Sequence, residues 1–200
     1  MNPMLKKFKQ ELAKLIKGDN QGQITFKSRT VRLKGYDYLV VRAVVPDIPE
    51  ILDIERAVYQ GKTPWNFANF EEQIRDKEKT LYLVVRYNDE MVAFAGCDMK
   101  YAKNEAHITN IAVLPAYQKL GLGQMLLRIL INEADNFGLR KVSLEVRESN
   151  MQAREAYAFA GFIDWIIKKD YYFDDGEDAI EMVYSISANK RRDMMVNGSK

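Results

Sequence analysis

The chain has 200 residues and 47% hydrophobic content, enough for one domain with a real core. A single cysteine and a single histidine exclude an internal disulfide, a cysteine- or histidine-based metal centre and a Ser–His triad. No apolar run approaches the roughly 18 residues of a membrane span, so the composition favours a reduced, cytoplasmic protein. The net charge of +2 conceals an asymmetry, because residues 1–42 are strongly basic and the remainder is mildly acidic.

The N-terminal stretch, residues 3–17, has the spacing of an amphipathic helix. Leu5, Phe8 and Leu12 fall on one face, and lysines surround them. A Gly/Gln-containing linker follows, so residues 1–37 are expected to form a basic extension. Two interpretations stay open: a docking helix for the ribosome, RNA or an anionic membrane surface, or a helix that packs on its own domain or on a subunit. The chain could accordingly be a monomer or a dimer.

The main domain is expected over residues 38–186, followed by a basic C-terminal tail at 187–200. The predicted strands cover residues 38–42, 81–87, 91–99, 107–113, 141–147, 162–169 and 179–186. The predicted helices cover residues 48–59 and 70–77, the stretch after Gly123 and the stretch after Asn150. Because helices interrupt a largely antiparallel series of strands, the pattern predicts an α+β (mixed α/β) fold, a mostly antiparallel sheet flanked by helices.

The central stretch of the chain runs from Ile111 to Gln124. It has the pattern of a strand end, a glycine-bearing loop and the start of a long helix. A helix N-terminus exposes unpaired N–H groups and the positive end of the helix dipole, which suits it to bind a phosphate or pyrophosphate. Gly121 and Gly123 lack a Cβ, so the backbone can turn tightly and approach a ligand. Taken alone, the stretch is equally consistent with an ordinary strand-to-helix turn.

Several chemically capable side chains also have ordinary structural explanations. Glu145 lies on the polar face of its strand, where it could be a solvated carboxylate paired with Arg147. Tyr157 lies on an alanine-rich helix face and would be a core aromatic. His107 and Cys97 are expected to be ordinary strand residues.

Five separated motifs resemble the GNAT superfamily of acetyl-CoA-dependent N-acetyltransferases. Its acyl-CoA motif, Gln/Arg-x-x-Gly-x-Gly/Ala, is matched by Gln118-Lys119-Leu120-Gly121-Leu122-Gly123. More narrowly, the chain is similar to the bacterial ribosomal-protein-alanine N-acetyltransferases. The motifs that carry this similarity are Asn110-Ile111-Ala112-Val113, Leu144-Glu145-Val146-Arg147-x-Ser149-Asn150, Ala156-Tyr157-x-x-x-Gly161-Phe162, and Tyr171-Tyr172 with Glu177-Asp178-Ala179-Ile180-x-Met182. The resemblance covers about residues 38–186 and leaves residues 1–37 without a counterpart.

The resemblance implies acetyl-CoA as cosubstrate, with no metal. It implies a general base at Glu145 and a general acid at Tyr157. The cofactor-binding residues that it implies are Ile111, Ala112, Val113, Gln118, Lys119, Leu120, Gly121, Leu122, Gly123, Gln124 and Asn150. Family members often have arginine where this chain has Lys119 and Gln124. Lysine supplies charge without the fork of donors that arginine offers, which bears on cofactor affinity.

The acceptor side is less defined. We expect substrate contacts at Trp65, Tyr171, Tyr172 and Asp178. Trp65 is equally consistent with a loop residue that caps the core. The acidic residues of 174–181 could steer a cationic peptide N-terminus, or they could simply form a turn.

Acetyl transfer requires a neutral amine. The pKa of a protein α-amine is about 7.7–8.0, against about 10.4 for lysine, so a carboxylate base serves the α-amine far more easily. The sequence therefore predicts an enzyme that acetylates a protein N-terminus, with a small-subunit ribosomal protein beginning with Ala or Ser as the expected partner. The alternatives are a GNAT enzyme acting on a small amine or a lysine side chain, and a non-catalytic acyl-CoA-binding or ribosome-associated module. A dinucleotide-binding domain is set aside because the loop lacks the third glycine.

Overall fold

The computed structural model describes residues 22–187. The helix predicted at residues 3–17 and nearly all of the predicted tail lie outside these residues. The strands are β1 (Arg29–Leu33), β2 (Tyr36–Arg42), β3 (Thr80–Tyr87), β4 (Glu90–Lys100), β5 (Glu105–Val113), β6 (Lys141–Arg147), β7 (Ile163–Tyr172) and β8 (Glu177–Ser185). The helices are α2 (Ile48–Val58), α3 (Phe67–Arg75), α4 (Leu122–Asn136) and α5 (Met151–Ala160), with short 3-10 turns η1 (Val45–Asp47), η2 (Tyr101–Lys103) and η3 (Pro115–Tyr117).

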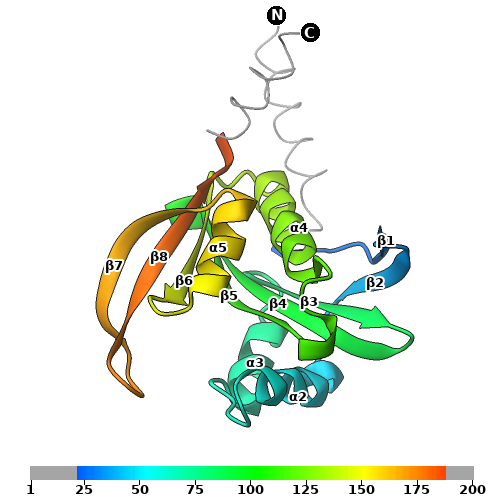
Figure 1. The fold of residues 1–200 in the computed structure, drawn as a ribbon. Coiled ribbons are helices and arrows are strands. Elements are labelled where there is room, and N and C mark those ends of the chain that lie inside the picture. The colour runs from blue at the N-terminus through cyan, green and yellow to red at the C-terminus, as the bar shows by residue number, and fades with distance from the viewer. Residues whose placement is uncertain (1–21, 188–200) are drawn as a thin grey trace, which may run out of the picture.

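The strands form one eight-stranded sheet in the order β1-β2-β3-β4-β5-β6-β8-β7. Neighbouring strands are antiparallel except β5 and β6, which run parallel because α4 carries the chain back across the sheet between them. Figure 1 shows α2 and α3 on one face of the sheet and α4 and α5 on the other. The predicted fold, a mostly antiparallel sheet flanked by helices, is confirmed.

The sheet begins earlier than the sequence pattern indicated. β1 pairs antiparallel with β2, with Val31 opposite Tyr38, so the boundary expected at residue 38 falls inside this hairpin. Only Val31 and Leu33 of β1 pack against the core, and the other positions are exposed. A five-residue strand with so little buried surface leaves a weak apolar signal, which explains why it was not recognised.

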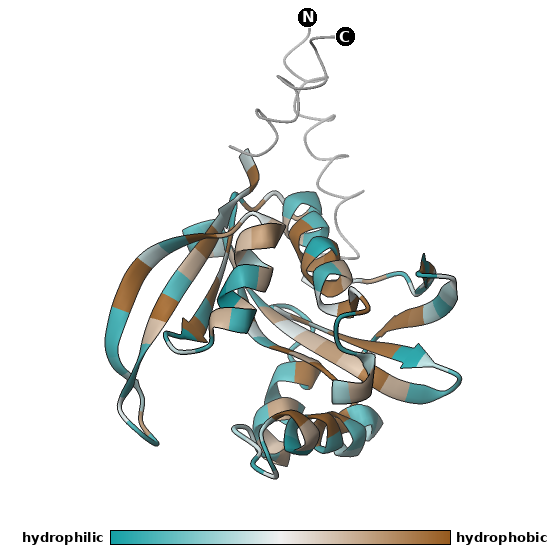
Figure 2. Ribbon diagram, viewed as in Figure 1, coloured by the Kyte–Doolittle hydropathy of each residue, from teal (hydrophilic) through white to brown (hydrophobic). Residues whose placement is uncertain are grey.

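Each face of the sheet has its own apolar core. The larger core lies beneath α4, where residues one turn apart, such as Leu122, Leu126 and Leu130, are all buried. The smaller core, which includes Ile51 and Phe70, lies beneath α2 and α3. Figure 2 shows the hydrophobic residues along α4 and through the central strands. Full burial of such a side chain contributes roughly 1.5–3 kcal/mol, so both faces of the sheet are firmly fixed.

A glycine in β4 fixes the centre of the sheet. A Cβ at Gly96 would lie 2.1 Å from the ring of Tyr82 in β3, so only glycine fits there. The β4–β5 register shifts next to it, between Gly96 and Cys97. The Tyr82 hydroxyl lies 2.8 Å from Thr109 Oγ1 and donates to Asn110 Oδ1 at 2.8 Å. Tyr82 therefore links β3 to the part of β5 that has left β6.

Candidate active site

The sheet opens between β5 and β6. The two strands pair over three positions, from Glu105 opposite Lys141 to His107 opposite Ser143, and then separate. Beyond that point β5 stays paired with β4 on its other edge. Within the described sheet no strand pairs with the β6-facing edge of Ile111–Val113, so backbone groups on that edge that have no other partner could bind a ligand. We refer to this opening as the β5–β6 gap.

The loop after β5 places a helix N-terminus beside the β5–β6 gap. Gly121 is the N-cap of α4 and has a φ of 96°, a left-handed conformation that favours glycine. No side chain caps α4, and the first amide that bonds back to Gly121 is that of Met125. The N–H groups of Leu122, Gly123 and Gln124 therefore lack partners within the helix. Such a helix end fits the pyrophosphate of a coenzyme A molecule.

Several predicted cofactor residues have side chains that support the loop. Gln118 Nε2 donates to the Val113 carbonyl at 3.1 Å. Gln124 Nε2 donates to the carbonyl of Ala156 at 2.6 Å, which joins α4 to α5. Asn150 Oδ1 accepts from the amide of Ala153 at 3.1 Å and caps α5. These side chains shape the site, and its ligand-facing surface is largely backbone.

One lysine near this loop was not predicted. Lys34, between β1 and β2, donates to the carbonyl of Lys119 at 3.0 Å. Lys119 itself has a positive φ of 60° in the turn that precedes Gly121. Together the two ammonium groups add positive charge beside the start of α4, which favours an anionic ligand.

Glu145 lies on β6, paired with two basic side chains. Its Oε1 is 2.5 Å from Lys168 Nζ and its Oε2 is 3.1 Å from His107 Nε2. Burial alone would raise the pKa of this carboxyl, but the hydrogen bonds from His107 and Lys168 outweigh it and lower the pKa to about 2. The alternative that Glu145 pairs with Arg147 is wrong, because Arg147 binds other carboxylates.

Lys168 bridges two carboxylates on adjacent strands. Glu181 of β8 lies directly opposite Glu145 of β6, and Lys168 Nζ is 2.9 Å from Glu181 Oε2. Burial lowers the pKa of Lys168, but hydrogen bonds to both carboxylates reverse that and raise it. Lys168 therefore stays protonated, and it keeps Glu145 and Glu181 side by side without repulsion.

His107 lies in β5, as expected of a strand residue, but it has polar partners that the sequence did not indicate. Besides its contact with Glu145, its Nδ1 lies 2.9 Å from Ser143 Oγ, and Ser143 donates to Glu105. Sequence spacing could not show this, since Ser143 is 36 residues away and reaches His107 only through the β5–β6 pairing. Cys97, in contrast, is fully buried, and burial raises the pKa of its thiol, as expected of a core cysteine.

Tyr157 projects from α5 against the larger core. Its ring lies 6.1 Å from that of Phe162, centroid to centroid. Burial raises the pKa of its phenol, and the neighbouring Tyr59 and Tyr172 raise it further. Since Tyr59 is the C-cap of α2 and Tyr172 ends β7, the phenol of Tyr157 lies near the ends of both elements. A phenol with a raised pKa keeps its proton, so it can donate that proton to a leaving thiolate.

The predicted acceptor residues fall into two groups. Trp65 stacks on Phe70 at 5.4 Å between centroids, and Tyr171 meets Tyr172 edge-on at 5.2 Å. Trp65, after α2, packs against the smaller core, whereas Tyr171 and Tyr172 lie at the end of β7, where Lys168 Nζ is 5.5 Å from the centroid of the Tyr171 ring. Asp178 is instead bound to a lysine of β7 and to the amide of Asp170, so its charge is already paired.

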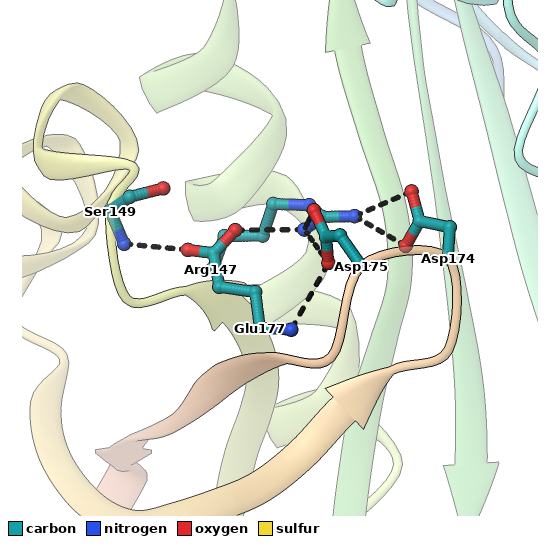
Figure 3. Close-up of polar contacts among 5 residues, drawn as sticks. All are labelled: Arg147, Ser149, Asp174, Asp175 and Glu177. Atoms are coloured by element: carbon teal, nitrogen blue, oxygen red, sulfur yellow. Dashed lines mark hydrogen bonds and ion pairs between the residues drawn. The ribbon is translucent and has the colours of Figure 1, made fainter.

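Arg147 fastens the β7–β8 turn to the end of β6. Figure 3 shows its guanidinium between Asp174, Asp175 and Glu177, all at 2.8 Å. Glu177 also accepts from the amide of Ser149 at 2.8 Å. Multiple charge-assisted hydrogen bonds of this kind fix geometry well. Of the acidic residues for which substrate steering and a plain turn were both open, Asp174, Asp175 and Glu177 are therefore partners of Arg147.

Arg147 also contacts an aromatic side chain at the end of β7. Its guanidinium carbon lies 3.9 Å from the centroid of the Tyr172 ring, a cation–π distance. Burial raises the pKa of the Tyr172 phenol, and the total shift brings it to about 12. Arg147 thus positions both the acidic turn and an aromatic side chain beside the β5–β6 gap.

Glu55 is a second buried carboxyl that sequence reasoning missed. It lies on α2, 2% exposed, and accepts from the amide of Trp65 at 3.4 Å. Burial raises its pKa to about 7, and the hydrogen bond from Trp65 only partly opposes that. The only signal in the sequence was a glutamate on the apolar face of a helix, which is common enough to be passed over.

Two negative findings concern the described residues. In the range 22–187, no group of three or more His, Cys, Asp or Glu side chains is arranged to hold a metal ion. Nor is any helix of that range long and apolar enough to cross a membrane.

A mixed sheet that opens beside an uncapped, glycine-preceded helix is the architecture of an acyl-CoA acyltransferase. The family model described as Acetyltransferase (GNAT) family matches residues 48–162. The chain therefore belongs to the GNAT acetyltransferase family, whose members use acetyl-CoA.

Enzymes of one activity within that family are among the proteins similar to this chain. The ribosomal protein bS18-alanine N-acetyltransferases of Escherichia coli and Salmonella typhimurium are each 37% identical over 143 residues, covering 70% of this chain and 93% of their own length. The crystal structure of the ribosomal-protein-S18-alanine N-acetyltransferase from Escherichia coli superimposes with a TM-score of 0.67. It is 34% identical and covers 74% of this chain and 94% of its own.

Proposed function

We propose that this enzyme transfers acetyl from acetyl-CoA to the N-terminal α-amine of a protein, and that the acceptor is a small-subunit ribosomal protein beginning with Ala or Ser. The single observation that carries the proposal is the similarity to the bS18-alanine N-acetyltransferases over the region that forms the site. The paired Glu145 at the β5–β6 gap supplies the chemistry. An α-amine with a pKa of about 7.7–8.0 needs only a modest base.

The coenzyme A portion would be held mainly by backbone. The free edge of Ile111–Val113 would bind the pantetheine arm, and the loop from Gln118 to Gln124 would bind the pyrophosphate. Lys119 and Lys34 would add charge at that end. Asn150 would support the arm through its cap of α5.

Glu145 would take the proton of the acceptor amine, directly or through a water. Its low pKa keeps it ionised at neutral pH, so it can also hold the ammonium group of the acceptor in place. Tyr157 would protonate the departing thiolate, whose thiol has a pKa of about 8.5, from a phenol that keeps its own proton. Trp65, Tyr171, Tyr172 and Asp178 would surround the first residues of the peptide.

The setting of the enzyme follows from its acceptor. A ribosomal protein substrate places the reaction in the cytoplasm. The part of the predicted basic extension that precedes β1 would provide contact with the ribosome or RNA, and the domain proper would end near residue 186. These contacts with the acceptor and the ribosome could be made by a monomer or by a dimer of the enzyme.

The test is turnover of acetyl-CoA by the purified protein with three sets of acceptors. These are peptides with free N-terminal Ala or Ser, N-blocked peptides of the same composition carrying a lysine, and a panel of small amines. Acetylation of the free N-termini alone is expected. In Glu145→Gln and Tyr157→Phe, kcat should fall by roughly 10²–10⁴-fold, the range for lost acid–base catalysis.

The other outcomes separate the alternatives. Turnover of the blocked lysine peptides or of the small amines would contradict the proposed acceptor. Tight binding of acetyl-CoA without turnover of any acceptor would indicate a binding module. Circular dichroism of both variants controls for misfolding.

A further inference from the structure

Acetylation of an amine at neutral pH releases a proton that must leave the site. Most α-amines carry a proton at pH 7, since their pKa is about 7.7–8.0. An ammonium acceptor loses two protons on becoming an amide, and the departing thiol takes only one of them. The other must reach solvent. The release of one proton per acetylation rests on the proposed function, and it is the same for any acceptor that binds as an ammonium ion.

A continuous line of hydrogen bonds leads from Glu145 to the start of β5 and β6. His107 Nε2 lies 3.1 Å from Glu145 Oε2, and His107 Nδ1 lies 2.9 Å from Ser143 Oγ. The Ser143 hydroxyl donates to Glu105 Oε1, and Glu105 Oε2 lies 3.0 Å from Lys141 Nζ. The side chains of Glu145 and Glu105 are 10% exposed, and that of Lys141 is 36% exposed. The line therefore joins an inner carboxylate to the surface.

The pattern of donors and acceptors places the hydrogens on His107. Ser143 has one hydroxyl hydrogen, which it gives to Glu105, so its oxygen can only accept from His107 Nδ1. The ionised carboxylate of Glu145 can only accept from Nε2. Both ring nitrogens therefore donate, which is the imidazolium form of the side chain.

The charges around Glu145 and His107 sum to zero when His107 is an imidazolium. The charged side chains that face it from β4 to β8 are Asp98, Lys100, Glu105, Lys141, Lys168 and Glu181. Asp98 stands directly opposite His107 in the β4–β5 register. With Glu145 there are four carboxylates and three ammonium groups, so a protonated His107 makes the cluster neutral. Hydrogen bonding and charge thus agree.

We propose that His107 is a proton-relay residue, which receives through Glu145 the proton lost by the acceptor amine and returns it to solvent through Ser143 and Glu105. On receipt, an N–H bond of the ammonium breaks, and the proton passes to Glu145 and on to Nε2 of a neutral ring. This produces the carboxylate–imidazolium pair of the structure. On release, the Nδ1 proton passes to Ser143 while the serine proton passes to Glu105, and solvent beside Lys141 takes it. The ring is then neutral with its hydrogen on Nε2. Exchange of that proton with solvent for one on Nδ1 returns the ring to the form that accepts at Nε2 in the next turnover.

The relay explains how a strongly acidic carboxyl can serve as a base. Two cationic partners hold the pKa of Glu145 at about 2, and such a group keeps a proton only briefly. When His107 is neutral, one of those partners is removed and the ring offers the proton a more basic position. Glu145 and His107 then act as a unit.

Nuclear magnetic resonance can test the line of hydrogen bonds without any acceptor. His107 is the only histidine in the chain, so its ring nitrogens give signals free of overlap. We would label histidine with nitrogen-15 and titrate the wild type, Glu145→Gln and Ser143→Ala. Both nitrogens should be protonated at low pH, and the titration midpoint should fall by about 0.5 unit or more in Glu145→Gln. A titration that neither substitution alters would overturn the proposal.

Kinetics can test the relay itself, using whichever acceptor the wild type acetylates fastest. His107→Gln keeps an N–H donor for Glu145 but cannot pass a proton on. Its kcat should fall roughly tenfold to a hundredfold, with an altered acid limb of the pH profile and an unchanged KM for acetyl-CoA. In a Glu145→Gln background the same change should have no further effect.

Equal losses in both backgrounds would mean that His107 acts only structurally. Acetylation of small amines in place of peptide N-termini would end the proposed function but leave this test intact, because those amines are ammonium ions too. If no acceptor is turned over, the nuclear magnetic resonance titration still decides whether the pair is coupled.

Discussion

The two halves of the candidate active site, the proposed cofactor half and the proposed acceptor half, are built from different chemical groups. The cofactor half presents backbone: the free edge of β5 and the first N–H groups of α4, shaped by the left-handed Gly121. The acceptor half presents charged side chains: Glu145 between His107 and Lys168, and Arg147 among three carboxylates. Backbone recognition suits a ligand that stays the same throughout a family. Side-chain networks can change with the acceptor, as fits a family that acetylates different amines.

The largest expected effect tests the cofactor half, through Gly123→Asp. A Cβ at Gly123 meets only Val113 Cγ2 at 3.9 Å, so the side chain fits. Its carboxylate would compete with the pyrophosphate for the N–H groups of α4, and affinity for coenzyme A should fall by roughly a hundredfold. An acidic residue in the first turn stabilises a helix by about 0.3–1 kcal/mol, so Tm should hold or rise.

Calorimetric titration with coenzyme A checks the affinity, and Gly123→Asn is the matched neutral control. Asparagine has nearly the same shape without the charge, so it should weaken binding far less. Equal weakening by both residues would mean that shape, not charge at the backbone N–H groups, decides cofactor binding there.

The next effect tests the acceptor half, through Arg147→Ala. Without the guanidinium, Asp174, Asp175 and Glu177 repel one another and the β7–β8 turn is released. The KM for a peptide acceptor should rise roughly tenfold, while the KM for acetyl-CoA should change little. Arg154→Ala is the control, because Arg154 pairs with Asp164 and is buried to a similar extent. A parallel loss in Arg154→Ala would contradict a local role for Arg147.

The smallest effect concerns Glu55, a charge without a basic partner among the contacts described. Its pKa is about 7 in the folded protein and about 4.5 in a model peptide, so the folded state keeps a proton that the unfolded state loses. Stability should therefore fall as pH rises from about 4.5 to 7. Glu55→Gln should unfold like the wild type at about pH 4.5 and be roughly 1–2 kcal/mol more stable at pH 8.

Denaturant unfolding at a series of pH values measures this difference. Asp53→Asn, on the exposed face of the same helix, is the control and should show no such trend. A difference between Glu55→Gln and the wild type that is constant with pH would show that the carboxyl is ionised throughout.

The sequence predicted the strand, loop and helix of the proposed cofactor half because their signal is local. Gln118 to Gly123 is one contiguous motif, and β6 and the start of α5 follow it within the expected bounds. The acceptor half depends on contacts between distant residues. Lys168 reaches Glu145 across 23 residues, and Arg147 reaches its partners across 27 to 30. Only the order in which the strands lie in the sheet brings these residues together.

Two sets of contacts went unrecognised in the sequence for the same physical reason. The partners of His107 come from β6, whereas its neighbours in sequence are apolar or small. Whether the acidic residues of 174–181 steer a substrate or form a turn stayed open because Arg147, which pairs with three of them, lies on another strand. Charge pairing over long separations is invisible to a pattern read along the chain.

The short β5–β6 ladder also has a consequence for cooperativity. Three paired positions join strands β1–β5 to strands β6–β8, so two blocks of sheet meet at a narrow seam. A coenzyme bound in the gap as proposed would contact both blocks, and its binding energy would stabilise their association. Amide hydrogen exchange along β6 and β8 should therefore slow when the coenzyme binds, including at residues that never touch it. In this fold, binding of the coenzyme and the free energy that holds the two blocks of the sheet together are thermodynamically linked.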